Sequence, residues 1–153
     1  INATNTANKH DGACVLILNS ISSNQIESIR GFCEVVTVRY VAVEPARAPI
    51  AFLEAIDLIL LENNLSVHDI DCWEINESFA LKPLAFQKKY RISPEKINIF
   101  GGNLAYGHPF GASGAIGVLH LTKALQFIRG KWGIFAMSAA GGLGAAVLLR
   151  YYK

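Results

Sequence analysis

Charge is scarce in this sequence, and the two signs nearly cancel. Lys and Arg together number 14 and Asp and Glu together number 12, so that 17% of the residues are charged and the net charge is +2. The basic residues are dispersed along the chain rather than clustered. A surface built for nucleic acid or anionic lipid needs a dense cationic patch, so the sequence argues against both classes of partner.

Long apolar runs are absent as well, although 52% of the residues are hydrophobic. Every apolar stretch is far shorter than the about 20 residues that a membrane-spanning helix needs. The 153 residues match one globular domain in length, and their apolar content is high enough to bury a sizeable core. We therefore expect one soluble domain over residues 1–153, with no membrane span.

Cysteine is limited to Cys14, Cys33 and Cys72, which lie far apart and show no CxxC or Cys/His ligand spacing. This spacing argues against a zinc site, and we expect no metal. Free buried thiols favour a reducing compartment, so we expect a cytoplasmic protein. The first residues resemble the interior of a longer protein, and a targeting segment could therefore be missing.

Several familiar catalytic motifs are also missing. The sequence contains no GxxxxGK[ST] loop, no GxGxxG after a strand, and no GxSxG elbow, since residues 111–114 (GASG) lack its spacing. These absences argue against nucleotide hydrolysis and against serine-hydrolase chemistry.

Short runs rich in β-branched residues alternate with stretches that repeat apolar residues at helical spacing. Strands are predicted at residues 12–18, 34–43, 71–75, 97–100, 132–137 and 145–151. Helices are predicted at residues 20–29, 50–63, 81–90 and 115–128. Only a short glycine-rich turn separates the last two strands, which predicts an antiparallel pair. The order of elements predicts an α/β domain with a mixed sheet covered by helices.

Three polar junctions follow strands, where open α/β sheets place their sites: Asn76, His108 and Ser138. His108 lies between Gly107 and Pro109, just before a predicted helix whose N-terminus disfavours the imidazolium form. It is our candidate general base, and the alternative is a loop histidine that only caps or packs. We interpret the other histidines as structural or solvated: His10, His68 and His120.

The remaining candidates each have a structural alternative. Asn76 could donate its amide to a water or an oxyanion, or could simply complete a turn. Glu77 is assigned a supporting role, as a cap or in an ion pair. Gly141, Gly142 and Gly144 could present N–H groups to an oxyanion or a phosphate, or could only turn a hairpin.

Together these segments resemble the C-terminal half of the thiolase family, the 3-ketoacyl-CoA thiolases and acetyl-CoA acetyltransferases. Residues 76–80 (NESFA) are similar to the family's NEAFA, and residues 101–115 to its GG…GHPxGxSGA. Residues 138–144 (SAAGGLG) are similar to its CxxGGxG, and residues 5–13 to its TxxNAS…DGA. The order and spacing match as well, so the resemblance covers nearly the whole chain.

The resemblance implies a fold of two similar α/β halves, each with a five-stranded mixed sheet and with the active site between them. This chain would be the second half, with the N-terminal half as its partner, in a homo-oligomer. The implied reaction is acyl transfer between acyl-CoA molecules, by thiolytic cleavage or Claisen condensation of a 3-ketoacyl-CoA, with CoA thioesters as substrates and no tightly bound cofactor. The residue matching His108 would activate the nucleophilic cysteine of the first half. The residue matching Asn76 would help to position a water in one oxyanion hole, and the C-terminal glycine-rich loop would form another.

Ser138 departs from the family, which has its proton-shuttling second cysteine at this position. A thiol titrates near pH ~8.5, whereas an alkyl hydroxyl stays protonated, so serine is a much poorer acid and base. None of the three cysteines lies in a matching motif. We therefore expect the chain alone to be inactive as a thiolase, and to self-associate through apolar surface that the missing half would cover. The alternative is a thiolase-like domain that serves only binding or oligomerisation.

Overall fold

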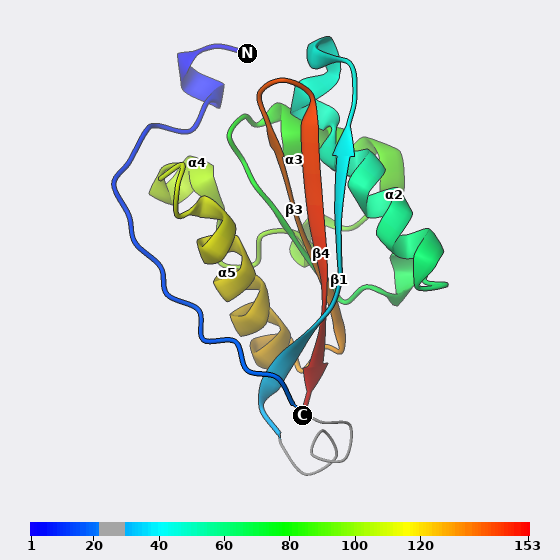
Figure 1. Cartoon of the computed structure of the whole chain (residues 1–153). Coiled ribbons are helices and arrows are strands. Elements are labelled where there is room, and N and C mark those ends of the chain that lie inside the picture. The colour runs from blue at the N-terminus through cyan, green and yellow to red at the C-terminus, as the bar shows by residue number, and fades with distance from the viewer. Residues whose placement is uncertain (22–29) are drawn as a thin grey trace.

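The computed structural model describes residues 1–21 and 30–153, and its described strands form one mixed sheet with helices on both faces (Figure 1). The strands are β1 (Phe32–Ala42), β2 (Cys72–Ile75), β3 (Trp132–Ala139) and β4 (Leu143–Tyr152). The helices are α2 (Phe52–Glu62), α3 (Leu81–Tyr90), α4 (Asn103–Tyr106) and α5 (Ser113–Ile128). A 3₁₀ helix, Pro45–Ile50, precedes α2.

The sheet has the order β1-β4-β3-β2. β2 is parallel to β3, whereas β4 is antiparallel to both β3 and β1. The predicted antiparallel pair at the end of the chain is thus confirmed, and its register places Ser138 opposite Gly144. A mixed sheet covered by helices is also confirmed.

Two apolar layers hold the helices against the sheet. On one face, Trp73 and Ile75 of β2 belong to the cluster that contains the buried side of α2. On the other face, Cys72 and Phe135 belong to the cluster that contains Leu121 of α5. All four residues of β2 are buried, as expected for a strand that is covered on both faces. This burial fixes the position of Asn76, the residue directly after β2.

The described residues contain four strands rather than the five that the resemblance implied. The strand predicted at residues 97–100 is reduced to one parallel bridge between Ile97 and Trp73. Asn98 is the physical reason: its backbone is left-handed (φ 48°), which breaks the extended conformation. The Asn98 side chain replaces the backbone hydrogen bonds that a neighbouring strand would make with Ile75. Its Oδ1 accepts from the Ile75 N–H (2.7 Å) and its Nδ2 donates to the Ile75 carbonyl (3.0 Å).

The strand predicted at residues 12–18 is wrong for this structure. This segment has no regular secondary structure and passes beside α5 (Figure 1). Val15 and Ile17 are 84% and 87% exposed, and Leu18 is exposed too. The sequence has strand composition, but a strand also needs a neighbour for its backbone hydrogen bonds, and none of the described strands pairs with it. The helix predicted at residues 20–29 lies almost wholly outside the described residues.

The other predicted helices are confirmed with shifts of a few residues at most. α5 ends at Ile128, and the next residue, Arg129, caps it in the left-handed conformation (φ 53°). Gly130 follows Arg129, and a Cβ at this position would lie 2.8 Å from Cβ of Asp71. Close packing against Asp71 therefore explains why a glycine is present here. Among the described helices, none is long and apolar enough to cross a membrane.

Candidate functional site

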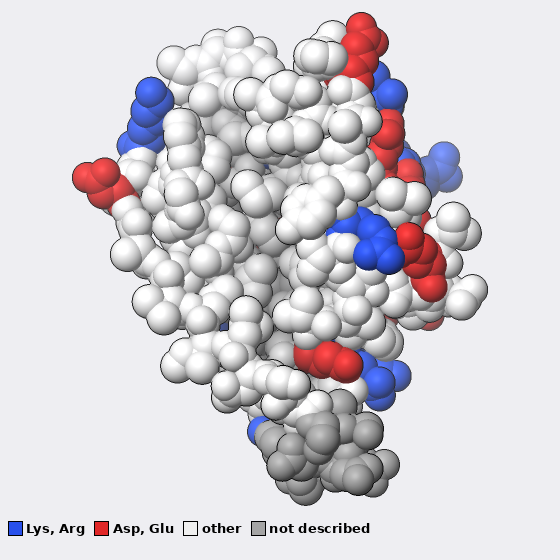
Figure 2. Space-filling model, in the orientation of Figure 1, with Lys and Arg blue, Asp and Glu red and all other residues white. Residues whose placement is uncertain are grey.

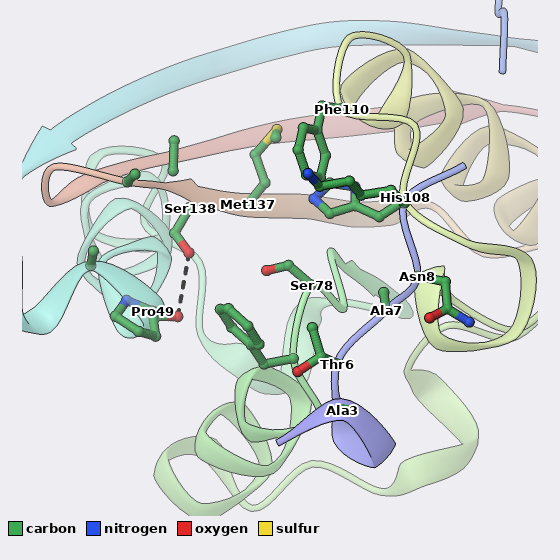
Figure 3. Close-up of a pocket in the computed structure, with 15 residues that line it drawn as sticks. Ala3, Thr6, Ala7, Asn8, Pro49, Ser78, His108, Phe110, Met137 and Ser138 are labelled. Atoms are coloured by element: carbon green, nitrogen blue, oxygen red, sulfur yellow. Dashed lines mark hydrogen bonds between the residues drawn. The ribbon is translucent and has the colours of Figure 1, made fainter. Parts of the chain in front are cut away.

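A pocket of about 670 Å³ opens where the N-terminal segment meets the ends of β2 and β3 and the loop before α5 (Figure 3). The N-terminal segment is tied to this place by backbone hydrogen bonds: Ala7 donates to Ser78 (3.1 Å), Ala80 to Asn5 (2.9 Å) and His108 to Asn8 (2.8 Å). Most of the lining is apolar or small. The lining residues are Ala3, Thr6, Ala7, Asn8, Lys9, Ala48, Pro49, Ser78, Phe79, His108, Phe110, Met137, Ser138, Ala139 and Ala140.

The structure brings two of the predicted site residues, His108 and Ser138, to the wall of this pocket. Ser78, which the sequence had not singled out, joins them there (Figure 3). Asn76 lies behind the wall and is almost fully buried. The three candidate glycines of the β3–β4 turn are not among the lining residues.

A short hydrogen-bond chain orients the His108 ring. Nδ1 lies 2.6 Å from Oγ of Ser113, and this hydroxyl donates to the Pro109 carbonyl at 2.8 Å. Because the Ser113 proton is already used, Oγ accepts, and Nδ1 is the protonated ring nitrogen. This assignment leaves Nε2 with a free lone pair. Phe110 contacts the ring edge-on at 4.8 Å between centroids.

The surroundings of His108 also keep it neutral. Partial burial, and then the positive charge of Lys82, lower the pKa of His108 below its ordinary value of 6.5. A neutral imidazole with a free Nε2 can accept a proton near neutral pH. His108 therefore has the protonation state that a general base requires.

Asn76 is held on both sides of its amide. Nδ2 donates to Oδ1 of Asn103 at 2.7 Å, and Oδ1 accepts from Nζ of Lys82 at 2.8 Å. Asn103 also accepts from the Glu77 N–H at 3.1 Å, which joins α4 to the end of β2. The Asn76 amide is thus fixed in orientation, and one of its N–H groups has no partner among the described residues.

Lys82, in the first turn of α3, is the main residue that the sequence analysis missed. It is 0% exposed, and Nζ contacts Ser78 Oγ at 3.0 Å as well as Asn76. Burial lowers the pKa of Lys82 to about 7. The sequence offered only a weak signal, namely that Ser78 lies four residues before Lys82 in the junction between β2 and α3.

Ser138 lies near the end of β3, and its hydroxyl donates to the Pro49 carbonyl at 3.3 Å. The 3₁₀ helix Pro45–Ile50 therefore contacts Ser138, the residue that the resemblance matched to a second cysteine. Ser138 and His108 belong to different elements and approach the pocket from opposite sides (Figure 3).

The glycines after Ser138 are required by the packing of the hairpin. Gly141 and Gly142 have φ values of 84° and 91°, which only glycine adopts readily. A Cβ on Gly142 would lie 2.0 Å from the Val43 carbonyl oxygen, and one on Gly144 would lie 2.5 Å from the Ala51 backbone. These contacts account for turning and close packing, while a role of the loop N–H groups in an oxyanion hole stays a prediction.

Two carboxylates near the site have structural partners. Glu77 accepts from Asn98 Nδ2 at 2.7 Å and from the Leu104 N–H at 3.2 Å. Glu74 is buried 3.6 Å from Nδ1 of His120. Burial, and then the charge of Glu77, raise the pKa of Glu74 to about 8, and burial lowers the pKa of His120. Near neutral pH, Glu74 and His120 are therefore a neutral pair rather than a salt bridge.

Comparison with known proteins gives a consistent result. The family model described as "Thiolase, C-terminal domain" matches residues 29–151. The mitochondrial acetyl-CoA acetyltransferase of Macaca fascicularis is 37% identical over 150 residues, which are 98% of this chain and 35% of that protein. The chain thus spans about a third of the length of the curated relatives that it matches.

Solved structures agree with the sequence comparison. The Acat5 thiolase of Ascaris suum in complex with coenzyme A superposes with a TM-score of 0.76 at 33% identity, over 85% of this chain and 34% of that one. Human mitochondrial 3-ketoacyl-CoA thiolase in complex with CoA gives a TM-score of 0.75 at 31% identity, over 79% and 31%.

Proposed function

From the premise that this chain belongs to the thiolase family, as its C-terminal domain, we propose that it works with a second half to transfer acyl groups between CoA thioesters. The second half would supply the nucleophilic cysteine. The reaction would be thiolytic cleavage of a 3-ketoacyl-CoA or its reverse, a Claisen condensation. Two solved relatives hold coenzyme A, which supports CoA thioesters as substrates.

The observation that carries this proposal is the state of His108. Its ring is oriented by Ser113, its pKa is lowered, and its Nε2 lone pair is free beside an apolar pocket. A base with these properties can take the proton of an incoming thiol. We assign His108 this role.

The other site residues would act on charge and protons. Asn76 would use its remaining N–H to hold a water or an oxyanion, and Lys82 and Asn103 would keep its amide oriented. Ser138 would occupy the proton-shuttle position. The turn with Gly141, Gly142 and Gly144 would present backbone N–H groups to a second oxyanion.

A non-catalytic thiolase-like domain is the second candidate, and Ser138 is the observation that favours it. Its hydroxyl donates to the Pro49 carbonyl and is far less acidic than a thiol. Such a domain would keep the fold and the partner surface while losing the proton transfer at the substrate.

We propose that the second half covers the bare apolar surface of this chain. Figure 2 shows one face on which charged side chains gather over α2, while the middle is largely uncharged. The bare surface consists of the segment with Val15, Ile17 and Leu18 and the outward side chains Val35, Val38 and Tyr40 of β1. β1 is also an edge strand of 11 residues, a length at which proteins usually cover the edge. A homo-oligomer of the assembled protein would use further parts of this surface.

The cytoplasm is the compartment that we propose, because the chain keeps three free cysteines. Matched relatives carry both mitochondrial and cytosolic names. Fractionation of cells that express the natural protein would decide the compartment.

A chimera tests the proposed function. In it, this chain replaces the matching C-terminal part of the Ascaris suum thiolase, and thiolysis of acetoacetyl-CoA is followed by loss of substrate absorbance. We expect Ser138→Cys to raise turnover by roughly 100-fold or more, the usual contribution of general acid-base catalysis. Adding His108→Ala to Ser138→Cys should abolish turnover again.

Each outcome of the chimera experiment separates the two candidate functions. Turnover with serine in place means that this site works without the thiol. Turnover only with Ser138→Cys means that the scaffold has lost its catalytic role and favours the non-catalytic domain. A folded chimera that stays inactive after the Ser138→Cys change would contradict the assignment of His108 and Asn76.

A further inference from the structure

We propose that Ser78 and Lys82 form a serine-lysine nucleophilic pair, which accepts an acyl group at the pocket of this chain without a second half. This activity goes beyond thiolase chemistry, because its nucleophile is a hydroxyl of this chain. Ser-Lys pairs are a known variant of the nucleophile-base arrangement and are recognised by geometry rather than by sequence position.

The distances fit such a pair. Nζ of Lys82 lies 3.0 Å from Oγ of Ser78, within the reach that a base needs to activate a nucleophile. Ser78 lines the pocket, and its hydroxyl points into the space bounded by Ser138 and His108 (Figure 3). The nucleophile is thus accessible from the pocket while the base lies behind it, away from water.

The surroundings of Lys82 favour the neutral amine that a base must be. The side chain is fully buried, and in the described part of the chain its hydrogen-bond partners are the uncharged Asn76 and Ser78 rather than a carboxylate. Desolvation without a counter-charge destabilises the ammonium form, consistent with a pKa of about 7.

Asn76 contributes to the orientation of the amine. Its Oδ1 accepts one N–H of Lys82 at 2.8 Å, and Asn103 in turn fixes the Asn76 amide. With one proton directed at Asn76, the neutral amine can direct its lone pair at the Ser78 hydroxyl. The third partner of such triads, which orients the base, is therefore present.

The step balances in atoms and protons for an acyl thioester. Oγ of Ser78 bonds to the carbonyl carbon, its proton passes to Nζ of Lys82, and the carbon-sulfur bond breaks. The leaving sulfur takes that proton from Nζ of Lys82 and departs as a thiol. Water then attacks the Ser78 ester while Lys82 takes one of its protons. Lys82 returns that proton to Oγ of Ser78 as the carboxylic acid leaves, which restores both the serine and the neutral amine.

A fluorophosphonate probe tests the pair directly, because it reacts with activated serines and contains no CoA. The oxygen of Ser78 would bond to phosphorus and fluoride would leave, while Lys82 takes the proton. The chain of residues 1–153 is labelled, digested and mapped by mass spectrometry. We expect the label on Ser78, with a rate that rises around pH 7 as Lys82 loses its proton.

Variants distinguish a catalytic role of Lys82 as the base from a purely structural role. Lys82→Met, which preserves the buried apolar stem, should slow labelling by roughly 100-fold, and Ser78→Ala should abolish it. Ser93→Ala and Lys88→Met, at exposed positions, are the matched controls and should label as the parent does. Circular dichroism and thermal melts verify folding of each variant.

Three results would overturn the proposal: no label on the folded chain, label on a residue other than Ser78, or undiminished labelling of Lys82→Met. If Lys82→Met does not fold, the pH profile of the parent decides, since a rate without a rise near pH 7 excludes Lys82 as the base. None of these results depends on the thiolase chimera, which reports on a different nucleophile.

Discussion

At the scale of single residues, three ionisable groups around the site, two of them buried and one partly buried, favour their neutral forms. Burial is the first cause for Glu74, Lys82 and His108 alike, and it moves the carboxyl pKa up and the two basic pKa values down. These three groups therefore add little charge to the region between β2 and the pocket near neutral pH. Such surroundings suit chemistry in which protons move between neutral groups.

The coupling between Lys82 and His108 gives the first prediction. The positive charge of Lys82 is one of the two causes that lower the pKa of His108, so Lys82→Met should move the titration midpoint of His108 up toward 6.5. Proton NMR of the imidazole would measure this midpoint in parent and variant. Lys88→Met, which changes an exposed lysine on the same helix, should leave the midpoint in place. An unchanged midpoint in Lys82→Met would mean that burial alone sets the pKa.

The second prediction concerns pH and stability. The pKa of Glu74 is about 8 in the folded chain, whereas its ordinary value is 4.5. Between pH 4.5 and pH 8, Glu74 therefore ionises in the unfolded chain but not in the folded chain, and the free energy of unfolding falls as the pH rises. The glutamine of Glu74→Gln cannot ionise, so at alkaline pH the free energy of unfolding of this variant should exceed that of the parent by at least about 1 kcal/mol. Urea denaturation across a pH series from acid to alkaline measures the difference. His120 and Glu77 face Glu74 in both proteins, so a difference that does not change with pH would contradict the prediction.

At the scale of elements, the contact between α5 and β3 depends on a glycine. A Cβ on Gly117 would lie 2.2 Å from the Phe135 ring, whereas one on Gly114, a turn earlier, would lie 3.6 Å from Sδ of Met137. The first distance is a clash and the second is an ordinary contact. Close approach of α5 is what carries Ser113, and with it the orientation of His108, to the pocket.

The third prediction compares these two glycines. Gly117→Ala should destabilise the chain by about 1–3 kcal/mol, the usual cost of overpacking. Gly114→Ala should change stability by less than about 1 kcal/mol, because alanine favours the helix. Urea denaturation at one pH compares both with the parent. Equal effects would mean that α5 can shift on the sheet without cost.

At the scale of the whole molecule, the chain carries apolar surface that its own described elements do not cover. Residues 5–8 are tied to the site by backbone hydrogen bonds, whereas Val15, Ile17 and Leu18 extend past α5 with their side chains in solvent. We expect this exposed segment to be an interaction surface. The segment gives a physical reason to expect self-association of a chain that spans about a third of its relatives' length.

The fourth prediction is that the chain self-associates through this segment. The sedimentation coefficient should rise with concentration in the parent and stay constant after Val15→Glu with Ile17→Glu, because the new charges oppose burial of the segment. Leu61→Glu is the matched control, since Leu61 is similarly exposed but lies on α2. At low concentration the melting temperature should be the same for the parent, the double variant and Leu61→Glu. A strictly monomeric parent would contradict the prediction.

The sequence by itself determined the family, the α/β class, three of the helices and the antiparallel end of the sheet. These follow from local patterns: helical periodicity over α2, α3 and α5, and a glycine turn between two apolar runs. It also predicted His108 and Ser138 as site residues from local motifs, and the structure places both at the wall of one pocket.

Only the tertiary structure decided the rest, because the deciding contacts join residues far apart in the chain. Burial of Lys82 depends on how α3 packs beside Phe52 and Asn76, and the tautomer of His108 depends on Ser113 across a loop. Residues 97–100 form a single bridge because the Asn98 side chain replaces a strand ladder with Ile75. Residues 12–18 have the composition of a strand and form none, because a strand exists only where another strand accepts its hydrogen bonds.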